Sequence, residues 1–262
     1  MKWITFLIAS LASLPSRAQE TGMWNHKSCA VVLTYDDGID IDLDNVRPAL
    51  DSMGFKGTFY VIGSASSIAN RMPEWRKLAA EGHELGNHSM FHPCDGSLPG
   101  RGFVTPDNDL SKYTVRRAVA EIRQTNVLLH AIDGRTERTF AYPCGDKSIH
   151  DTLFYAWLRH DFAAARGVSA KFDTLGKVNF DDVDCFAMNG QSGAQMIDLV
   201  RHALRTHTLL VFLFHGVGGG HNLNVSLQAH SELLHFLKAH EREIWIAPMV
   251  DVAEYIRQRQ AH

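Results

Sequence analysis

Two short motifs in this chain carry residue types that bind divalent metals. The apolar run Ala30-Val-Val-Leu33 leads into Thr34-Tyr-Asp-Asp-Gly38, which has two adjacent carboxylates, and His88-Ser-Met-Phe-His92 has two histidines four residues apart. One carboxylate and two imidazoles make a three-ligand set that leaves coordination positions open for water and substrate. The remaining aspartate is then free to act as a general base. The combination indicates metal-assisted hydrolysis.

Each motif by itself is common. The chain has 15 histidines in 262 residues, so about one His-x-x-x-His pair is expected by chance. Adjacent aspartates also recur, at Asp181-Asp182. What distinguishes Asp36 and Asp37 is their position after a buried apolar run, because α/β folds gather active-site groups at the carboxyl ends of their strands.

Two further segments resemble known motifs without meeting their requirements. The spacing from His83 to His88 is one residue longer than in the zinc-protease motif, so the two side chains diverge on a helix. The segment Gly216-Val-Gly-Gly-Gly220 lacks the last glycine of the dinucleotide fingerprint and the lysine of a P-loop. We interpret this glycine-rich segment as a mobile loop beside His215.

The first 18 residues have the pattern of a secretory signal peptide. Lys2 supplies a positive start, Trp3 to Leu14 form a short apolar core, and Ser16-Arg-Ala18 places small residues at a cleavage site. The core is too short to span a bilayer. We therefore expect cleavage near Ala18, a periplasmic or secreted protein, and no membrane span in the mature chain.

Composition limits the remaining possibilities. The chain is 45% hydrophobic with a net charge of −3, so residues 19–262 are expected to form a single domain with a full core. The small negative charge provides no electrostatic attraction to nucleic acid or to anionic membrane. We expect a monomer that binds neither.

Apolar runs alternate with amphipathic stretches along the chain. Strands are predicted at Ala30–Tyr35, Gly57–Ile62, His83–Gly86, Arg138–Tyr142, Phe162–Ala165, Thr208–Phe214 and Glu243–Ile246. Helices are predicted at Val46–Met53, Pro73–Glu81, Lys112–Ile132, Ile149–Leu158, Ala194–Arg205, Ser226–Ala239 and Val250–Arg259. This alternation predicts a parallel α/β barrel, incomplete at seven strands. The irregular stretch Pro93–Asp109 follows the histidine motif and is expected to form a rim or lid of the site.

Four motifs occur in an order that resembles the polysaccharide deacetylases, the NodB-homology enzymes of carbohydrate esterase family 4. They are Thr34–Gly38, His88–His92, Phe140-Ala-Tyr-Pro-Cys-Gly145 and Val211-Phe-Leu-Phe-His215. The resemblance extends from about Cys29 to Tyr255. It implies a distorted, incompletely closed (β/α)7-type barrel, which agrees with the strand count.

The resemblance also implies roles for individual residues. The metal ligands would be Asp37, His88 and His92, with Asp36 as general base and His215 as general acid. The oxyanion and substrate would meet the turn Tyr142-Pro143-Cys144, chiefly through the Cys144 N–H. Asp184 would orient His215 or lie on the surface.

Two motifs depart from the family pattern. Many members have an arginine after the phenylalanine of the third motif, where it pairs with the catalytic aspartate, whereas this chain has Ala141. The fourth motif is represented only by Asp181-Asp-Val-Asp184-Cys185-Phe186, without its usual tryptophan. Arg166, at the end of a predicted strand, either replaces the missing arginine in space or is a structural or surface charge.

The four cysteines, Cys29, Cys94, Cys144 and Cys185, allow three complete pairings in an exported protein. We favour a Cys94–Cys144 bridge, because both cysteines lie in or beside motifs of the same site. Buried free thiols are the alternative, above all for Cys29 within a strand.

The expected activity is hydrolysis of acetyl groups on a carbohydrate or polysaccharide, with an acetylated oligo- or polysaccharide as substrate. Zinc suits two imidazoles and one carboxylate, and cobalt or nickel suits the same ligands. The motifs do not separate N-acetyl substrates of chitin or peptidoglycan type from O-acetyl substrates such as acetyl xylan. A non-catalytic glycan-binding protein, indicated by Ala141, and a metal-dependent peptide amidase are the other classes.

Overall fold

A long buried strand organises the molecule. In the computed structural model, which describes residues 24–260, β1 (Cys29–Asp37) has β9 (Leu209–Phe214) along one side. Its other side is shared by β12 (Ile244–Ile246) at the start of the strand and β2 (Thr58–Val61) at the end. The predicted signal peptide lies outside the described residues.

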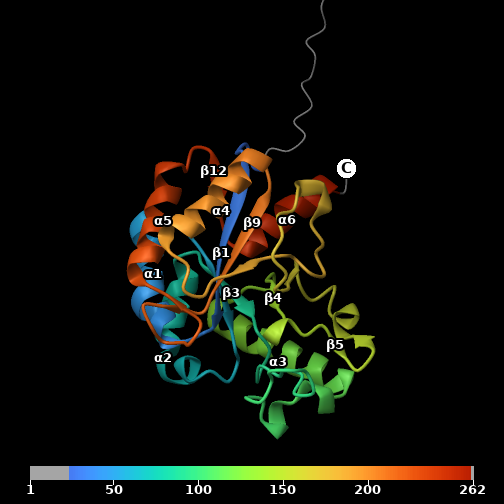
Figure 1. Ribbon diagram of the computed structural model, residues 1–262. Helices are drawn as coiled ribbons and strands as arrows, with labels where there is room; N and C mark the ends of the chain where they lie inside the picture. The colour runs from blue at the N-terminus through green and yellow to red at the C-terminus, as the bar shows by residue number, and fades with distance from the viewer. Residues whose placement is uncertain (1–23, 261–262) are drawn as a thin grey trace, which may run out of the picture.

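The strands of the sheet are parallel and follow the order β7-β4-β3-β2-β1-β9-β8. Figure 1 shows β1 and β9 side by side at the centre of the fold. The remaining strands are β3 (Glu84–Asn87), β4 (Phe140–Ala141), β7 (Ala165–Arg166) and β8 (Phe186–Ala187). A single parallel bridge between Arg166 and Val183 brings the two edges of the sheet together just before β8. The result is a strongly curled, incompletely closed barrel, as predicted.

Helices flank this sheet (Figure 1). They are α1 (Arg47–Met53), α2 (Ser66–Ala80), α3 (Val115–Asp133), α4 (Gly193–Thr206), α5 (Leu227–Ala239) and α6 (Met249–Gln260). The helix α1 ends at Met53, as predicted, and Gly54 follows it in the left-handed conformation. The prediction that Pro73 opens the second helix is wrong, because α2 begins at Ser66. Arg71 has a non-helical backbone, so Pro73 lies in the first turn after a kink, where a proline is tolerated.

The predicted helix at Ile149–Leu158 is also wrong. The chain forms an antiparallel pair, β5 (Ser148–Ile149) and β6 (Thr152–Leu153), followed by a 3₁₀ turn at Phe154–Trp157. Ile149, Phe154 and Leu158 are buried in a small separate core with Phe140 and Tyr142. Their helix-like spacing therefore reflects burial of an irregular segment.

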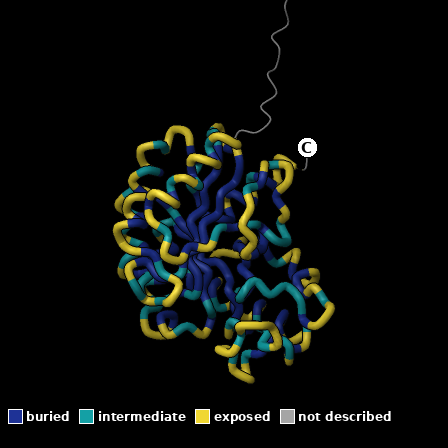
Figure 2. The backbone as a smooth tube through the Cα atoms, in the orientation of Figure 1, coloured by how far each residue is buried: buried dark blue, intermediate teal, exposed yellow. Residues whose placement is uncertain are grey.

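The larger core lies between the sheet and its helices (Figure 2). Residues Cys29 to Tyr35 are all fully buried, because β1 has strands on both sides and helices over it. This explains why β1 is a continuous apolar run without alternation. None of the helices within residues 24–260 is long and apolar enough to cross a membrane.

Candidate metal and catalytic site

The predicted site residues lie where strands end. Asp36 and Asp37 end β1, His88 follows β3, Tyr142 follows β4 and His215 follows β9. Because the strands are parallel, their carboxyl ends lie at one end of the barrel. The fold thus brings together residues up to 179 positions apart in sequence.

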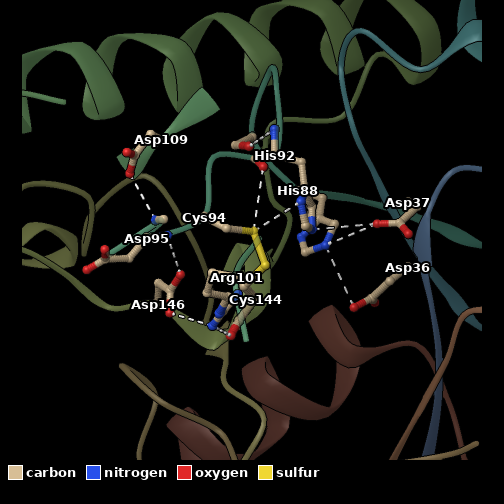
Figure 3. The surroundings of a disulfide bond; sticks show 12 residues. Asp36, Asp37, His88, His92, Cys94, Asp95, Arg101, Asp109, Cys144 and Asp146 are labelled. Atoms are coloured by element: carbon tan, nitrogen blue, oxygen red, sulfur yellow. Dashed lines mark hydrogen bonds and ion pairs between the residues drawn. A yellow bond between two sulfur atoms is a disulfide. The ribbon is translucent and has the colours of Figure 1, made fainter. Parts of the chain in front are cut away.

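Asp37, His88 and His92 form a compact cluster. The Oδ1 atom of Asp37 lies 3.6 Å from His88 Nε2 and 3.7 Å from His92 Nε2. Both imidazoles point toward this carboxylate (Figure 3). One potential ligand atom from each residue lies within 4.8 Å of the others.

The donor atoms of this cluster fit a divalent metal. Asp37 Oδ1 is buried and has no hydrogen-bond partner among the described residues, which is unfavourable unless a cation or proton compensates it. His88 Nδ1 donates to the Ala141 carbonyl at 2.9 Å, so Nε2 carries the free lone pair. Burial lowers the pKa of His88 to about 3 and also lowers that of His92. Both rings are therefore neutral, as metal ligation requires.

Three residues of the site have an unusual backbone. Asp37 (φ 80°), His92 (φ 52°) and Cys144 (φ 56°) all adopt the left-handed region, which side chains other than glycine rarely occupy. Such conformations persist only where surrounding structure enforces them, and they concentrate at functional sites.

Asp36 is paired with a buried arginine. Arg166 Nη2 lies 2.7 and 2.5 Å from the two oxygens of Asp36, and the Arg166 side chain is fully buried. Burial by itself would raise the pKa of Asp36, but the charge of Arg166 lowers it below the ordinary value.

This pairing accounts for the departure at Ala141. Ala141 on β4 is in register with Arg166 on the adjacent strand β7. The guanidinium that the family resemblance places at position 141 is therefore supplied from the neighbouring strand. Of the two interpretations of Arg166, replacement of the missing arginine is the one that the structure supports.

His215 lies beside the two aspartates. Its ring stacks on His221 at 4.7 Å between centroids, and its Nδ1 is buried with no hydrogen-bond partner among the described residues. Burial lowers the pKa of His215, while the charges of Asp36 and Asp37 act in the opposite direction.

Among the described residues, Asp184 makes no hydrogen bond or ion pair with His215, so the structure gives no support to the alternative in which Asp184 orients His215. Its carboxylate pairs with Lys171 at 3.3 Å. The next residue, Cys185, turns inward and contacts Arg166 Nη1 at 3.7 Å. Adjacent side chains of an extended segment point to opposite sides, so Asp184 points away from the site.

A cavity of about 420 Å³ opens over these residues. Its lining includes Asp36, Asp37, His88, His92, His215, His221, Tyr142 and Cys144. Of the predicted oxyanion turn, Pro143 is buried and does not line this cavity. The Tyr142 hydroxyl donates to the Asp181 carbonyl at 2.7 Å and is therefore already engaged.

The predicted Cys94–Cys144 disulfide is present (Figure 3). It ties the segment after His92 to the turn that follows β4, and Cys94 Sγ lies 3.5 Å from His92 Nδ1. Arg101 Nη2 reinforces the link by donating to the Cys144 carbonyl and to Asp146. Cys29 and Cys185 are buried free thiols.

The predicted rim segment Pro93–Asp109 does border the site. Pro99, Gly100, Arg101 and Phe103 line the main cavity. Phe103 is 66% exposed and also borders an adjoining cavity of about 340 Å³. The two cavities share Asp37, His92 and His221, so they meet over the cluster of Asp37, His88 and His92.

Sequence reasoning missed His221. This residue lies beyond the glycine-rich segment Gly216–Gly220 and reaches back to the site, where its Nε2 is 3.8 Å from Asp37 Oδ2. The glycines that directly follow His215 could have indicated this contact, because they allow the chain to turn sharply and return toward the site.

These features, together with a comparison of the chain against known families, show to which protein family it belongs. The family model described as "Polysaccharide deacetylase" matches residues 25–163, slightly more than half of the chain. The chain belongs to the polysaccharide deacetylase family. The matched region includes the aspartate pair, both histidines of the second motif and the turn at Cys144, and it ends before Arg166, His215 and His221.

Known proteins of several kinds resemble this deacetylase family member. A gellan lyase from a Bacillus species is 26% identical over an alignment 270 positions long, which covers 92% of this chain and 10% of that protein. A putative polysaccharide deacetylase from Mycobacterium smegmatis shares the fold, with a TM-score of 0.61, 14% identity and coverage of 98% of this chain and 96% of that one. A family 4 acetyl xylan esterase from Clostridium thermocellum, solved with a cobalt ion, has a TM-score of 0.52, 21% identity and coverage of 86% and 91%. The chain spans between 10% and 42% of the length of five curated relatives that it matches.

Proposed function

We propose that this chain is an exported, divalent-metal-dependent deacetylase that hydrolyses acetyl groups on a carbohydrate. One observation carries the proposal. A three-residue ligand set (Asp37, His88 and His92) lies in the same cavity as a second carboxylate, Asp36, whose charge is stabilised by Arg166.

The metal would be held by Asp37 Oδ1 and the Nε2 atoms of His88 and His92. When bound there, a divalent metal supplies Lewis acidity to water and to the acetyl carbonyl. Zinc suits this donor set best, and cobalt or nickel also suits it. The cobalt ion in the Clostridium thermocellum acetyl xylan esterase supports a divalent metal in this fold.

Asp36 is the general base in this proposal. Arg166 keeps its carboxylate ionised at neutral pH, so Asp36 is ready to accept a proton from the attacking water. His215 then donates a proton to the leaving amine or alkoxide. Burial lowers the pKa of His215, so the free ring is neutral, while the charges of Asp36 and Asp37 favour its protonated form. The proton that Asp36 takes from water would balance the proton that protonated His215 gives to the leaving group.

The turn at Cys144 is proposed to contact the acetyl oxygen through its backbone N–H. Cys144 lines the cavity in a left-handed conformation, and the disulfide to Cys94 holds it in place. Such preorganised donors stabilise the charge that develops on the carbonyl oxygen.

We propose export on the basis of the signal-peptide pattern in residues 1–18. The Cys94–Cys144 disulfide supports this location, because disulfides persist in oxidising compartments outside the cytosol. Residues 19–262 would then act as a single domain and as a monomer.

The decisive experiment is acetate release from a panel of N-acetylated glucosamine oligomers, acetylated xylan and N-acetylated peptides. We expect acetate from at least one carbohydrate, loss of activity after removal of metal by a chelator, and recovery when Zn²⁺ is added back. New peptide termini would favour an amidase. Retained carbohydrate binding without acetate release would favour a glycan-binding protein, although Arg166 now accounts for the Ala141 departure that suggested it.

A further inference from the structure

The loop after His215 is built to a defined shape. Its ends, β10 (Gly216–Val217) and β11 (Asn224–Val225), pair in parallel. Asn224 Oδ1 accepts from the Gly219 N–H at 2.9 Å, and the Gly218 N–H donates to the Val225 carbonyl at 2.8 Å. The segment expected to be a mobile loop is thus held by its own hydrogen bonds.

Glycine is required at the turn of this loop. Gly218 has a φ of 75°, and a Cβ atom there would lie 2.4 Å from Leu227 Cγ. The loop turns back over the site and places His221 beside both His215 and Asp37. The His221 side chain remains 33% exposed, on the cavity side.

His221 contacts both parts of the site. Its ring stacks on His215 with 4.7 Å between centroids and 15° between planes. Its Nε2 faces Asp37 Oδ2 at 3.8 Å, whereas the other oxygen, Oδ1, faces His88 and His92. The two oxygens of Asp37 therefore face different partners.

The tautomer of His221 follows from its second ring nitrogen. The Leu223 backbone N–H donates to His221 Nδ1 at 3.0 Å, so Nδ1 is an acceptor. In the neutral ring the proton is then on Nε2, the atom that faces Asp37. A nitrogen that carries a proton has no lone pair for a metal, so this tautomer directs the Nε2–H of His221 at Asp37 Oδ2 and leaves His221 outside the ligand set. The 3.8 Å separation is longer than a hydrogen bond, so the contact is an electrostatic one between the N–H and the carboxylate.

We propose that His221 is a positioning residue, which holds Asp37 Oδ2 so that Oδ1 stays directed at the metal and which fixes the His215 ring by stacking. The proposal rests on the metal site of the proposed function. Partners of this kind orient the direct ligands, and their loss typically lowers metal affinity about 10–100-fold.

The test measures Zn²⁺ affinity of the full chain by competition with a chromophoric chelator, with no substrate present. His221→Phe keeps an aromatic ring beside His215 but removes the donor, and we expect its Zn²⁺ affinity to fall about 10–100-fold. His221→Gln keeps an N–H donor near the Nε2 position and should stay within about threefold of the unmodified chain. His235→Phe, the same replacement on the exposed surface of α5, is the matched control.

Two results would overturn the proposal, and two others would show whether the positioning role or the proposed function has failed. Unchanged affinity in His221→Phe would show that His221 does not position Asp37. Equal losses in His221→Phe and His221→Gln would make His221 a direct ligand and contradict the positioning role. If the unmodified chain bound no metal, the proposed function itself would fail, whereas Zn²⁺ binding without acetate release would leave the positioning role standing.

Discussion

At the scale of single residues, the aspartate pair shows how one backbone torsion creates a site. Successive side chains of a regular strand point to opposite faces. Asp37 interrupts that alternation with a φ of 80°, and both carboxylates consequently lie near His88 Nε2, at 3.8 Å for Asp36 and 3.6 Å for Asp37. Two neighbours in sequence can then take separate roles as base and ligand.

Asp36→Asn should separate catalysis from metal binding. The amide keeps the shape of the side chain but cannot accept the proton from water, so we expect the rate of acetate release to fall about 10²–10⁴-fold. Metal content, measured by elemental analysis, should stay at that of the unmodified chain. Loss of metal in Asp36→Asn together with its retention in Asp37→Asn would reverse the two assigned roles.

The ligand residues should behave in the opposite manner. Asp37→Ala, His88→Ala and His92→Ala each remove one of three ligands, so metal and activity should disappear together while circular dichroism still reports a folded chain. Full activity with unchanged metal in any of these variants would exclude that residue from the ligand set.

Removal of Arg166 should shift the pH dependence of the rate. The Arg166 charge lowers the pKa of Asp36, and the base works only when ionised, so activity is lost as the pH falls through that pKa. In Arg166→Met the pKa of Asp36 rises, and the acidic limb of the pH–rate profile should move to higher pH.

A strand-swapped variant provides the control for this prediction. Removing one partner of a buried ion pair costs about 3–5 kcal/mol and can by itself unfold a protein. Because Ala141 and Arg166 are in register, Ala141→Arg combined with Arg166→Met returns a guanidinium to the neighbouring strand. The acidic limb should move back toward its original position, and an identical limb in all folded variants would show that Arg166 does not tune Asp36.

At the scale of elements, the site depends on loops that are tied to each other as well as to the sheet. The segment after His92 is irregular over most of residues 93–109, so the sheet does not fix its position. The disulfide and the contacts of Arg101 anchor this segment to the turn after β4. They therefore fix His92 and Cys144 relative to one another.

Breaking the disulfide should lower the free energy of unfolding. Cys94 and Cys144 are 50 residues apart, and closing a loop of that length stabilises by about 4 kcal/mol in the chain-entropy model. The double variant Cys94→Ser, Cys144→Ser should show this loss in denaturant unfolding. Dithiothreitol should destabilise the unmodified chain to a similar degree and leave the double variant unaffected. Equal sensitivity of both proteins to the reductant would contradict the prediction.

At the scale of the whole molecule, the two ends of the barrel differ in chemistry. The carboxyl ends of the strands hold the cluster of Asp36, Asp37, His88 and His215, whereas the amino ends hold the buried carboxylate of Glu84. This carboxylate accepts from the Thr139 N–H and hydroxyl, from the Thr58 hydroxyl and from the Val250 N–H at the start of α6. Glu84 thus joins β2, the start of β4 and the last helix.

Glu84→Ala should destabilise the fold without changing the geometry of the candidate metal site at the other end of the barrel. Several buried donors would lose their acceptor, and each unsatisfied group costs about 1–3 kcal/mol. We expect a loss of about 3 kcal/mol or more in the free energy of unfolding, with normal Zn²⁺ affinity of the protein that remains folded. Glu137→Ala, on the exposed surface, is the matched control and should change stability by less than about 0.5 kcal/mol. A small effect of Glu84→Ala would show that this cluster is not a structural link.

Local patterns in the sequence were sufficient to predict most of the order of strands and helices. They also identified the residues of the candidate metal cluster, Asp37, His88 and His92. A buried parallel strand needs a continuous apolar run, and its end needs polar groups, so Asp36, Asp37 and His215 could be placed at strand ends before any coordinates. The family motifs added the distinct roles of the aspartates and the disulfide partner. The prediction failed where periodicity was weak. At Ile149–Leu158 the spacing of apolar residues predicted a helix that the structure does not contain.

Tertiary structure decided the contacts that join distant segments. That Arg166 reaches Asp36 depends on the register of β4 with β7, and no local pattern in a two-residue strand specifies that register. That His221 reaches Asp37 depends on a loop closed by its own hydrogen bonds. The physical reason is the same in both cases. The spacing of side chains along the sequence indicates which face of a strand or helix is buried. Which residue packs against that face depends on the packing of the whole chain.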